Sequence, residues 1–183
     1  MDKKIPHPDL YGLVLIGGKS SRMGTDKSML QYHKVTQREY SYQLLSKYCS
    51  RVFLSCNPTQ QDSLALPHIV DTHCEGPMTG ILSAHEEYPQ ASWLVLACDM
   101  PYVDIDILNQ LLLHRDDSSI ATCFYKERIE PLCAIWEASC FPSFKKYHRS
   151  GNRSPRRFLE ENKIKALFPT ESEKKKLRNI NEG

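Results

Sequence analysis

The sequence predicts a three-layer, Rossmann-like α/β fold, in which a mainly parallel sheet lies between two layers of helices. Short apolar segments rich in β-branched or aromatic residues recur along the chain, and segments with helical spacing of apolar residues alternate with them. The predicted strands are apolar throughout, which is typical of strands covered on both faces. Right-handed crossovers between parallel strands place helices on both sides of such a sheet.

Five segments are predicted to be buried strands: YGLVLI (11–16), RVFLSC (51–56), WLVLAC (93–98), IATCFY (120–125) and PLCAIW (131–136). Four segments have helical periodicity, namely residues 38–48, 77–88, 105–114 and 138–148. Ligands of open α/β sheets bind beyond the carboxyl ends of the strands. The informative loops are therefore those that follow Ile16, Cys56, Val70 and Cys98.

Length and composition favour one cytoplasmic domain. The chain has 183 residues, of which 40% are hydrophobic, and this is enough for one substantial core. We expect a single domain over residues 1–183, with a polar, partly mobile tail over residues 170–183. No apolar run of membrane-spanning length and no signal-peptide pattern is found, so we expect a cytoplasmic location without membrane contact.

The seven cysteines are scattered and include no C-x-x-C pair, which argues against a disulfide framework and a thiolate zinc site. We expect them to be reduced and mostly buried. The net charge of +2 does not predict nucleic-acid binding. Basic residues gather after the last predicted strand, either as a docking surface for an anion or as a solvated helical face. These residues are Lys145, Lys146, Arg149, Arg153, Arg156 and Arg157.

The segment GGKSSRMGTDKSML directly follows the first predicted strand. Glycines let backbone N–H groups approach phosphate oxygens, while Arg22 and Lys27 supply positive charge where pyrophosphate would depart. Gly17 and Gly18 are adjacent, which excludes a G-x-G-x-x-G fingerprint, and no Gly-Lys-Ser/Thr closes a Walker A loop. A tight turn with chance basic residues is the alternative. The pattern favours a polyphosphate site.

The segment LVLIGGKSSRMGTDKSML resembles the signature L-x-G-G-x-S-x-R-M-G-x-D-K of the molybdenum cofactor guanylyltransferases, which have the nucleotide-diphospho-sugar transferase fold. The resemblance implies transfer of GMP from GTP to the terminal phosphate of molybdopterin. It also implies that Leu15, Ile16, Gly17, Gly18 and Lys27 bind the nucleotide, with Ile16 acting through its main chain. Relatives that act on sugars, or that cytidylylate molybdopterin, usually begin with L-A-A-G, so the glycine pair favours the guanylyl branch.

Three further segments match this family: LSCNP with Asn57, IVDTHCEGPMTG with Asp71, and LACDMPYV with Asp99. The resemblance implies that Asn57 lies at the nucleotide site, that Asp71 recognises guanine and that Asp99 binds Mg²⁺. A carboxylate can accept hydrogen bonds from both N1–H and the 2-amino group of guanine. Magnesium prefers one or two carboxylates together with phosphate oxygens and water.

Simpler interpretations of these three segments remain open. An Asn-Pro pair after a strand is an ordinary turn, and an Asp-x-Pro sequence can begin a helix, although Asp104 is the better cap candidate. Asp71, His73, Cys74 and Glu75 together suggest a metal cluster. Adjacent loop residues rarely complete a coordination shell, so packing or exposed positions are favoured for His73 and Cys74.

The segment RNINEG resembles the family's terminal N-x-N motif and implies that Asn179 and Asn181 lie near the active site. The reaction implied is in-line attack of the acceptor phosphate on the α-phosphorus of magnesium GTP, with Arg22 and Lys27 stabilising pyrophosphate and Asp99 holding Mg²⁺. The expected partners are GTP, molybdopterin or molybdenum cofactor, and other proteins of cofactor biosynthesis. The alternatives are a molybdopterin cytidylyltransferase, a sugar-phosphate nucleotidyltransferase, and a non-catalytic nucleotide-binding protein.

Overall fold

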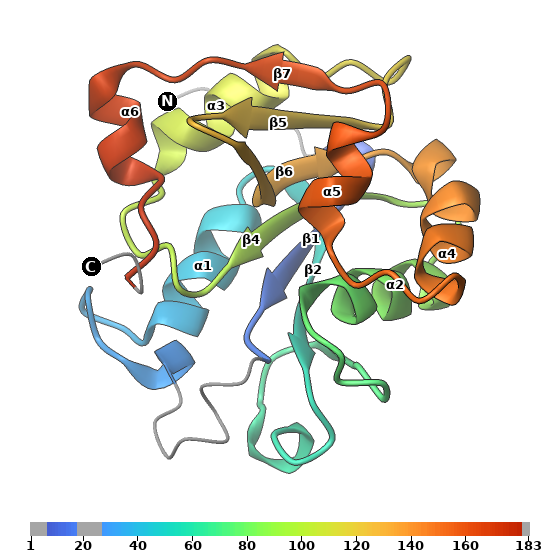
Figure 1. Cartoon of the computed structure of the whole chain (residues 1–183). Helices are drawn as coiled ribbons and strands as arrows, with labels where there is room; N and C mark the ends of the chain where they lie inside the picture. The colour runs from blue at the N-terminus through green and yellow to red at the C-terminus, as the bar shows by residue number, and fades with distance from the viewer. Residues whose placement is uncertain (1–6, 18–26, 181–183) are drawn as a thin grey trace.

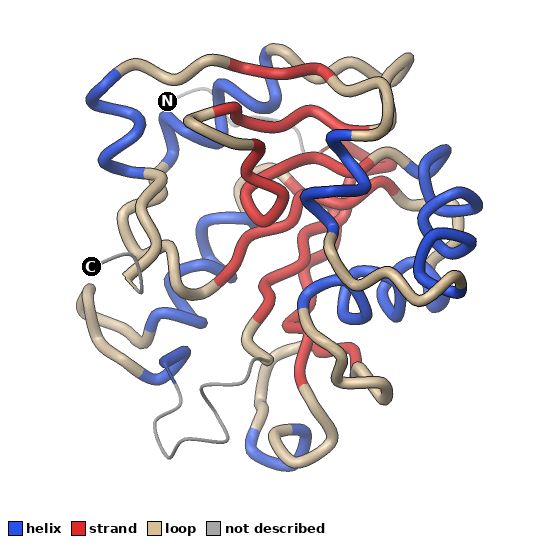
Figure 2. Tube along the Cα trace, viewed as in Figure 1, coloured by secondary structure: helices blue, strands red, loops and turns tan. Residues whose placement is uncertain are grey.

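A computed structural model describes residues 7–17 and 27–180 of the chain. Strands and helices alternate through most of it, as Figures 1 and 2 show. None of the helices described is long and apolar enough to cross a membrane. In chain order the elements are β1 (His7–Leu15), η2 (Lys27–Met29), α1 (Gln37–Leu45), β2 (Cys49–Cys56), η3 (Gln61–Ser63), β3 (His68–Val70), α2 (Pro77–Glu87), β4 (Ser92–Ala97), α3 (Ile105–Leu113), β5 (Ala121–Tyr125), β6 (Ile129–Trp136), η4 (Ala138–Cys140), α4 (Phe141–Arg149), α5 (Pro155–Glu160), β7 (Lys165–Leu167) and α6 (Glu171–Lys176).

The strands form one seven-stranded sheet in the order β3-β2-β1-β4-β6-β5-β7. Pairing is parallel between β1 and β2, β1 and β4, β2 and β3, and β5 and β7. Strand β6 runs antiparallel to both β4 and β5. The mainly parallel α/β sheet is therefore confirmed. The β5–β6 hairpin was not predicted; only residues 126–128 separate the two strands, which is too short for the crossover that parallel neighbours need.

Strand β1 contributes alternate side chains to two separate cores. Leu10 and Val14 belong to the core that contains buried side chains of α1 and α3. Leu13 and Leu15 belong to the core that contains buried side chains of α2, α4 and α5. Successive side chains of a strand point to opposite faces, so this strand is covered on both sides. Helices lie on both sides of the sheet in Figure 1, which gives the three layers predicted from the sequence.

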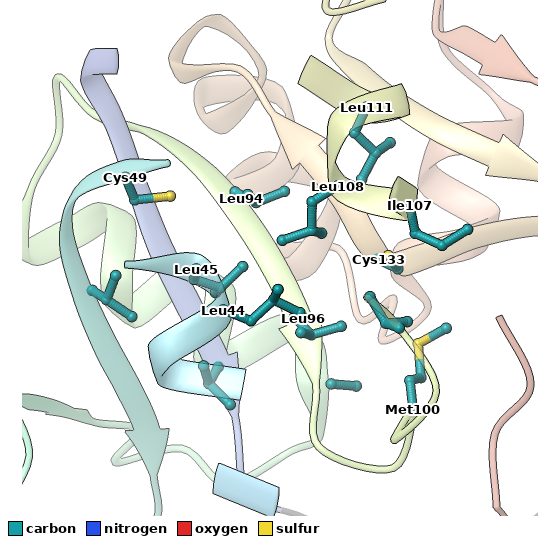
Figure 3. Packing of buried hydrophobic residues seen from close by; sticks show 14 of the residues in the cluster. Leu44, Leu45, Cys49, Leu94, Leu96, Met100, Ile107, Leu108, Leu111 and Cys133 are labelled. Atoms are coloured by element: carbon teal, nitrogen blue, oxygen red, sulfur yellow. The ribbon is translucent and has the colours of Figure 1, made fainter. Parts of the chain in front are cut away.

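Figure 3 shows the first of these cores, where Leu44 and Leu45 at the end of α1 and Leu108 of α3 meet the leucines of β4. Four cysteines belong to the same core, namely Cys49, Cys56, Cys98 and Cys133, and burial raises the pKa of the Cys49 thiol to about 12. All seven cysteines are free, and every one except Cys74 is buried. This confirms the prediction of reduced, mostly buried thiols.

The polar stretch that begins at Thr170 contains a helix, α6, which the sequence periodicity did not predict. Thr170 and Glu173 form a capping box: the Thr170 hydroxyl oxygen accepts a bond from Glu173 N, and the Glu173 carboxylate accepts one from Thr170 N. Leu177, just past the helix, is fully buried. At the start of α3, the predicted cap is confirmed, because the Asp104 carboxylate accepts bonds from two main-chain N–H groups of the first turn.

Candidate functional site

A cavity of about 530 Å³ lies at the carboxyl ends of β1, β2 and β3. It is lined by Leu15 and Gly17 at the end of β1, by Asn57 after β2 and by Asp71 after β3. This is the edge at which open α/β sheets bind ligands, and the volume suits a small molecule. The structure therefore brings together four of the residues that the sequence predicted for a nucleotide site.

The main chain beyond β1 remains attached to β2. The N–H groups of Ile16 and Gly17 both donate to the Ser55 carbonyl oxygen, at 3.1 and 3.2 Å. The side chains of Leu15 and Ile16 are buried, and that of Ile16 belongs to a core and does not line the cavity. A contact between the main chain of Ile16 and the nucleotide stays a prediction.

Several predicted residues lie outside the part of the chain that the structure describes. Gly18 and Arg22 fall in the segment 18–26, and Asn181 falls in the segment 181–183. The backbone of Lys27 begins the 3-10 helix η2, but its side chain lies outside the described atoms. Their roles at the nucleotide phosphates stay predictions.

Asn57 forms the turn that its Asn-Pro sequence suggested. Its Oδ1 accepts hydrogen bonds from the Thr59 hydroxyl at 2.6 Å and from Gln60 N at 3.1 Å, and Asn57 N donates to Gln60 Oε1 at 3.1 Å. Local bonds of this kind are the reason that asparagine favours turns. They fix the position of Asn57 at the wall of the cavity.

Asp71 is buried at the end of β3, and its carboxylate is held by three hydrogen bonds. Oδ1 accepts from the N–H groups of His73 and Cys74, at 3.0 and 3.1 Å. Oδ2 accepts from the Thr79 hydroxyl at 2.6 Å. A carboxylate offers about four acceptor positions. Three are occupied, so the group is oriented and keeps capacity for a further donor.

The backbone of this loop is unusual at two residues. Cys74 has a φ of 53°, in the left-handed region that non-glycine residues seldom adopt, and the Asp71 carboxylate binds its N–H group. Gly76 has a φ of 112°, and Pro77 follows it as the first residue of α2. Proline suits the first helical position because its missing N–H group is not needed there. The Gly-Pro pair thus sets the direction in which α2 leaves the cavity.

The metal-cluster interpretation of this loop is wrong. In the described ranges, no group of three or more His, Cys, Asp or Glu side chains is placed to hold a metal ion. Glu75 instead contacts the end of α4 and the loop after it, where its Oε2 lies 3.0 Å from His148 Nε2 and 2.7 Å from Arg153 Nε. The bond from His148, with help from Arg153, holds the pKa of the Glu75 carboxyl below its usual range.

Asp99 lies just past the end of β4 and does not line the cavity. Its main-chain carbonyl accepts a hydrogen bond of 2.9 Å from Ile180 N, and Figure 1 shows the segment after α6 running down toward the loop after β4. The preceding residue, Asn179, carries a side-chain oxygen, Oδ1, that is buried and has no hydrogen-bond partner in the described structure. Carboxylate and amide oxygens are both ligands that a hard divalent cation accepts.

The sequence did not single out Thr79, whose hydroxyl holds the Asp71 carboxylate. A threonine in the first turn of a helix opened by Gly76 and Pro77 was the available signal, since hydroxyls at helix starts commonly bind nearby polar groups.

Most of the basic residues after β6 have partners within the protein. Those on α4 and α5 and in the loop between them are engaged largely by carboxylates, which favours a structural face over an anion-docking surface. Lys145 pairs with Glu86, Arg153 with Glu75 and Arg157 with Glu161, and Arg156 donates to the Ile129 carbonyl oxygen.

Comparison with protein families places most of the chain in one group. The family model described as "MobA-like NTP transferase domain" matches residues 12–166. A "Molybdenum cofactor biosynthesis bifunctional protein" of Synechocystis sp. is 38% identical over 158 residues, which cover 82% of this chain and 46% of the relative. A "Probable molybdenum cofactor guanylyltransferase" of Clostridium perfringens is 36% identical over 129 residues, which cover 69% of this chain and 65% of the relative. The chain thus spans between about half and two thirds of these relatives.

The crystal structure of "Molybdopterin-guanine dinucleotide biosynthesis protein A" from Archaeoglobus fulgidus superposes with a TM-score of 0.76. The alignment covers 93% of this chain and 92% of that chain, at 22% sequence identity. At this identity the likeness shows a shared fold. It confirms the fold class that the sequence predicted.

Proposed function

Since the chain belongs to the family of MobA-like NTP transferase domains, we propose that it transfers GMP from GTP to the terminal phosphate of molybdopterin and releases pyrophosphate. The observation that carries this proposal is the cavity at the ends of β1 to β3, with the oriented Asp71 carboxylate in its wall. The name of the Clostridium perfringens relative supports the same activity, and the name of the Synechocystis relative supports a place in molybdenum cofactor biosynthesis. The free thiols of the chain fit a reducing compartment, which supports a cytoplasmic location.

Asp71 is proposed to select the base. Guanine presents N1–H and a 2-amino group on one edge, whereas adenine lacks this pair of donors, and the acceptor position that remains on the Asp71 carboxylate can take one of the two. The bonds from His73, Cys74 and Thr79 hold the carboxylate in one orientation before the nucleotide arrives. A group fixed in this way loses little freedom on binding, which favours specificity.

The chemistry needs no covalent intermediate. An acceptor phosphate is already anionic near neutral pH, so the protein's part is to align it with the α-phosphorus of GTP and to stabilise negative charge on the departing pyrophosphate. We assign the latter role to Arg22 and Lys27. Asp99, with the buried Asn179 Oδ1, would hold Mg²⁺, which when bound neutralises charge on phosphate oxygens. GTP and molybdopterin are then the substrates, and proteins that supply or receive the cofactor are its expected partners.

Nucleotide selectivity tests this proposal. With Mg²⁺ present, we expect GTP to raise the midpoint of thermal unfolding more than CTP, UTP or ATP, because a ligand at about 100 times its dissociation constant stabilises the folded state by about 2.7 kcal/mol. Pyrophosphate release that requires molybdopterin completes the test. A preference for CTP would favour the cytidylyltransferase alternative, and binding without release would favour a nucleotide-binding protein.

The substitution Asp71→Asn tests directly whether the Asp71 carboxylate selects the base. Asn keeps an oxygen for the loop N–H groups and loses the negative charge and the second oxygen, Oδ2, on which the remaining acceptor position lies. The matched control is Thr79→Val, which leaves the Asp71 carboxylate in place and removes the hydroxyl that donates to Oδ2 and to the Gly76 carbonyl and accepts from Glu75 N. We expect Asp71→Asn to abolish the preference for GTP over ATP, and Thr79→Val to weaken GTP binding while preserving the preference. An unchanged preference in Asp71→Asn would refute the assignment.

A further inference from the structure

A buried ion pair lies at the tip of the β5–β6 hairpin. Lys126 Nζ is 3.3 Å from Glu130 Oε2, and the two side chains are only 9% and 4% exposed. Removing two charges from water costs several kcal/mol per ion, so an apolar pair of similar volume often stabilises a fold equally well. Stability alone therefore does not account for charges at this position.

The lysine side chain has a second contact, which joins the hairpin to the C-terminal part of the chain. Lys126 Nζ donates a hydrogen bond of 2.9 Å to the main-chain carbonyl of Leu177, the residue just past the end of α6. Carbonyl groups at the end of a helix carry partial negative charge, and an ammonium group suits them. The carboxylate of Glu130 is fixed in turn, because its Oε1 accepts a bond from Leu132 N at 3.2 Å.

The segment that follows α6 is thus held at two points. Lys126 binds the Leu177 carbonyl, and Ile180 N donates to the Asp99 carbonyl at the end of β4. Asn179, with its buried and unpartnered Oδ1, lies between these two anchors. Figure 1 shows the same course, with α6 beside the hairpin tip and the segment after it running toward the loop after β4. The first anchor lies three residues before the contact with Asp99.

We propose that Lys126 and Glu130 are positioning residues for the reaction. Their ion pair holds residues 177–180 against the end of β4 and so fixes the side chain of Asn179 relative to Asp99. The inference rests on the proposed function, because the expected fall in kcat is measured in the GMP-transfer reaction. The placement of residues 177–180 is measurable without any reaction.

The chain provides a matched control on the same helix. Lys176, in the last turn of α6, pairs with Asp104 at 2.5 Å and with Asp106 at 3.1 Å near the start of α3. Lys176 is about 29% exposed, so this contact is a surface attachment of α6. These two ion pairs do not involve the carbonyl of Leu177. Loss of Lys176 therefore tests whether any weakened attachment of α6 has the same effect as loss of Lys126.

The test variant is the double substitution Lys126→Met with Glu130→Gln. It removes both charges together, which avoids leaving one charge buried alone. Gln keeps an acceptor for Leu132 N, and Met fills the volume of the lysine stem, but neither restores a cation at the Leu177 carbonyl. Lys126→Arg keeps a cationic donor and serves as the rescue, and Lys176→Met is the control.

Two measurements decide the question. Amide hydrogen exchange follows the Ile180 N–H, which the Asp99 carbonyl protects, and steady-state kinetics follow pyrophosphate release. In the double variant we expect faster exchange at residue 180 and a fall in kcat of about tenfold to a hundredfold, since small misplacements near reacting groups cost that much. The KM for GTP is expected to stay within about twofold, because the cavity at β1 to β3 is untouched. Lys126→Arg and Lys176→Met are expected to resemble the wild type in both measurements.

Unchanged exchange at residue 180, or an unchanged kcat in a folded double variant, overturns the inference. An equal loss of kcat in Lys176→Met overturns it as well, because the effect would then be a general loosening of α6. Should the double variant not fold, Lys126→Leu with Glu130→Gln takes its place, because it also removes both charges and the cation at the Leu177 carbonyl, with the same expected pattern and the same refuting result. If the wild-type protein transfers no GMP, the proposed function fails, while the exchange measurement still decides whether the ion pair positions residues 177–180.

Discussion

The substitution Glu137→Gln tests how a buried charge network stabilises the edge of the sheet opposite the cavity. Arg115 donates two hydrogen bonds of 2.7 Å to the Glu137 carboxylate, and the Ser92 hydroxyl donates a third, also of 2.7 Å. The side chains of Arg115 and Glu137 are 13% and 5% exposed. The same guanidinium also pairs with Asp9 at 3.0 Å, but the Asp9 side chain is 57% exposed.

These exposures predict very different energetic effects. Removing one partner of a buried pair costs about 3–5 kcal/mol, because the other charge remains buried without compensation. An exposed pair contributes only about 0–1 kcal/mol after solvent screening. For a chain of this length, 1 kcal/mol shifts the unfolding midpoint by about 2–4 °C. We therefore expect Glu137→Gln to lower Tm by about 6–20 °C and Asp9→Asn by less than about 4 °C.

Urea denaturation and thermal unfolding of the two variants measure the difference. The KM for GTP is the control, because Glu137 lies at the opposite edge of the sheet from the cavity, and it is expected to remain unchanged. Equal losses of stability in Glu137→Gln and Asp9→Asn would refute the reasoning, since burial would then not decide the strength of the pair.

Three further predictions concern single side chains. A Cβ on Gly80 would lie 2.6 Å from Ser55 Oγ, so Gly80→Ala should cost about 1–3 kcal/mol in overpacking, more than the helix propensity it gains. Urea denaturation should show a lower free energy of unfolding for Gly80→Ala, and adding Ser55→Ala should restore it. Asp104→Ala removes the cap of α3, and the same assay should show a free energy of unfolding lower by about 1 kcal/mol. An unchanged free energy of unfolding would argue against the cap. Burial raises the pKa of Cys56 to about 11, so at pH 8 its thiol stays protonated. A thiol reagent should then label Cys74 first, and Cys74→Ser should lose the fast phase.

The sequence predicted five of the seven strands and four of the six α-helices of the described residues, because their apolar residues repeat with clear periods; it missed β3 and β7, which have three residues each, and the short helix α5. It did not predict the direction of β6, since an apolar run is equally compatible with parallel and antiparallel pairing. The short connection over residues 126–128 contained that information. It also did not predict α6, whose stability comes from the capping box at Thr170 and the burial of Leu177 and not from an apolar stripe.

For the candidate site, the resemblance identified Asn57 and Asp71, and the structure brings both to one cavity. It did not identify the contacts that hold such residues. The bond from Lys126 to Leu177 joins residues far apart in the sequence, and no local spacing marks it. Contacts of this kind depend on how the sheet brings distant segments together, so the spacing of residues along the sequence does not predict them.

Strand β1 also limits how the chain can change in length. Because Leu10 and Val14 face one core while Leu13 and Leu15 face the other, deleting a single residue inside the strand would interchange the two sets. The same deletion would turn the peptide groups of Ile16 and Gly17 away from the Ser55 carbonyl that they now share. Insertions and deletions are therefore expected to be excluded from this strand, and the distance from its first core leucine to the glycine pair is expected to stay constant.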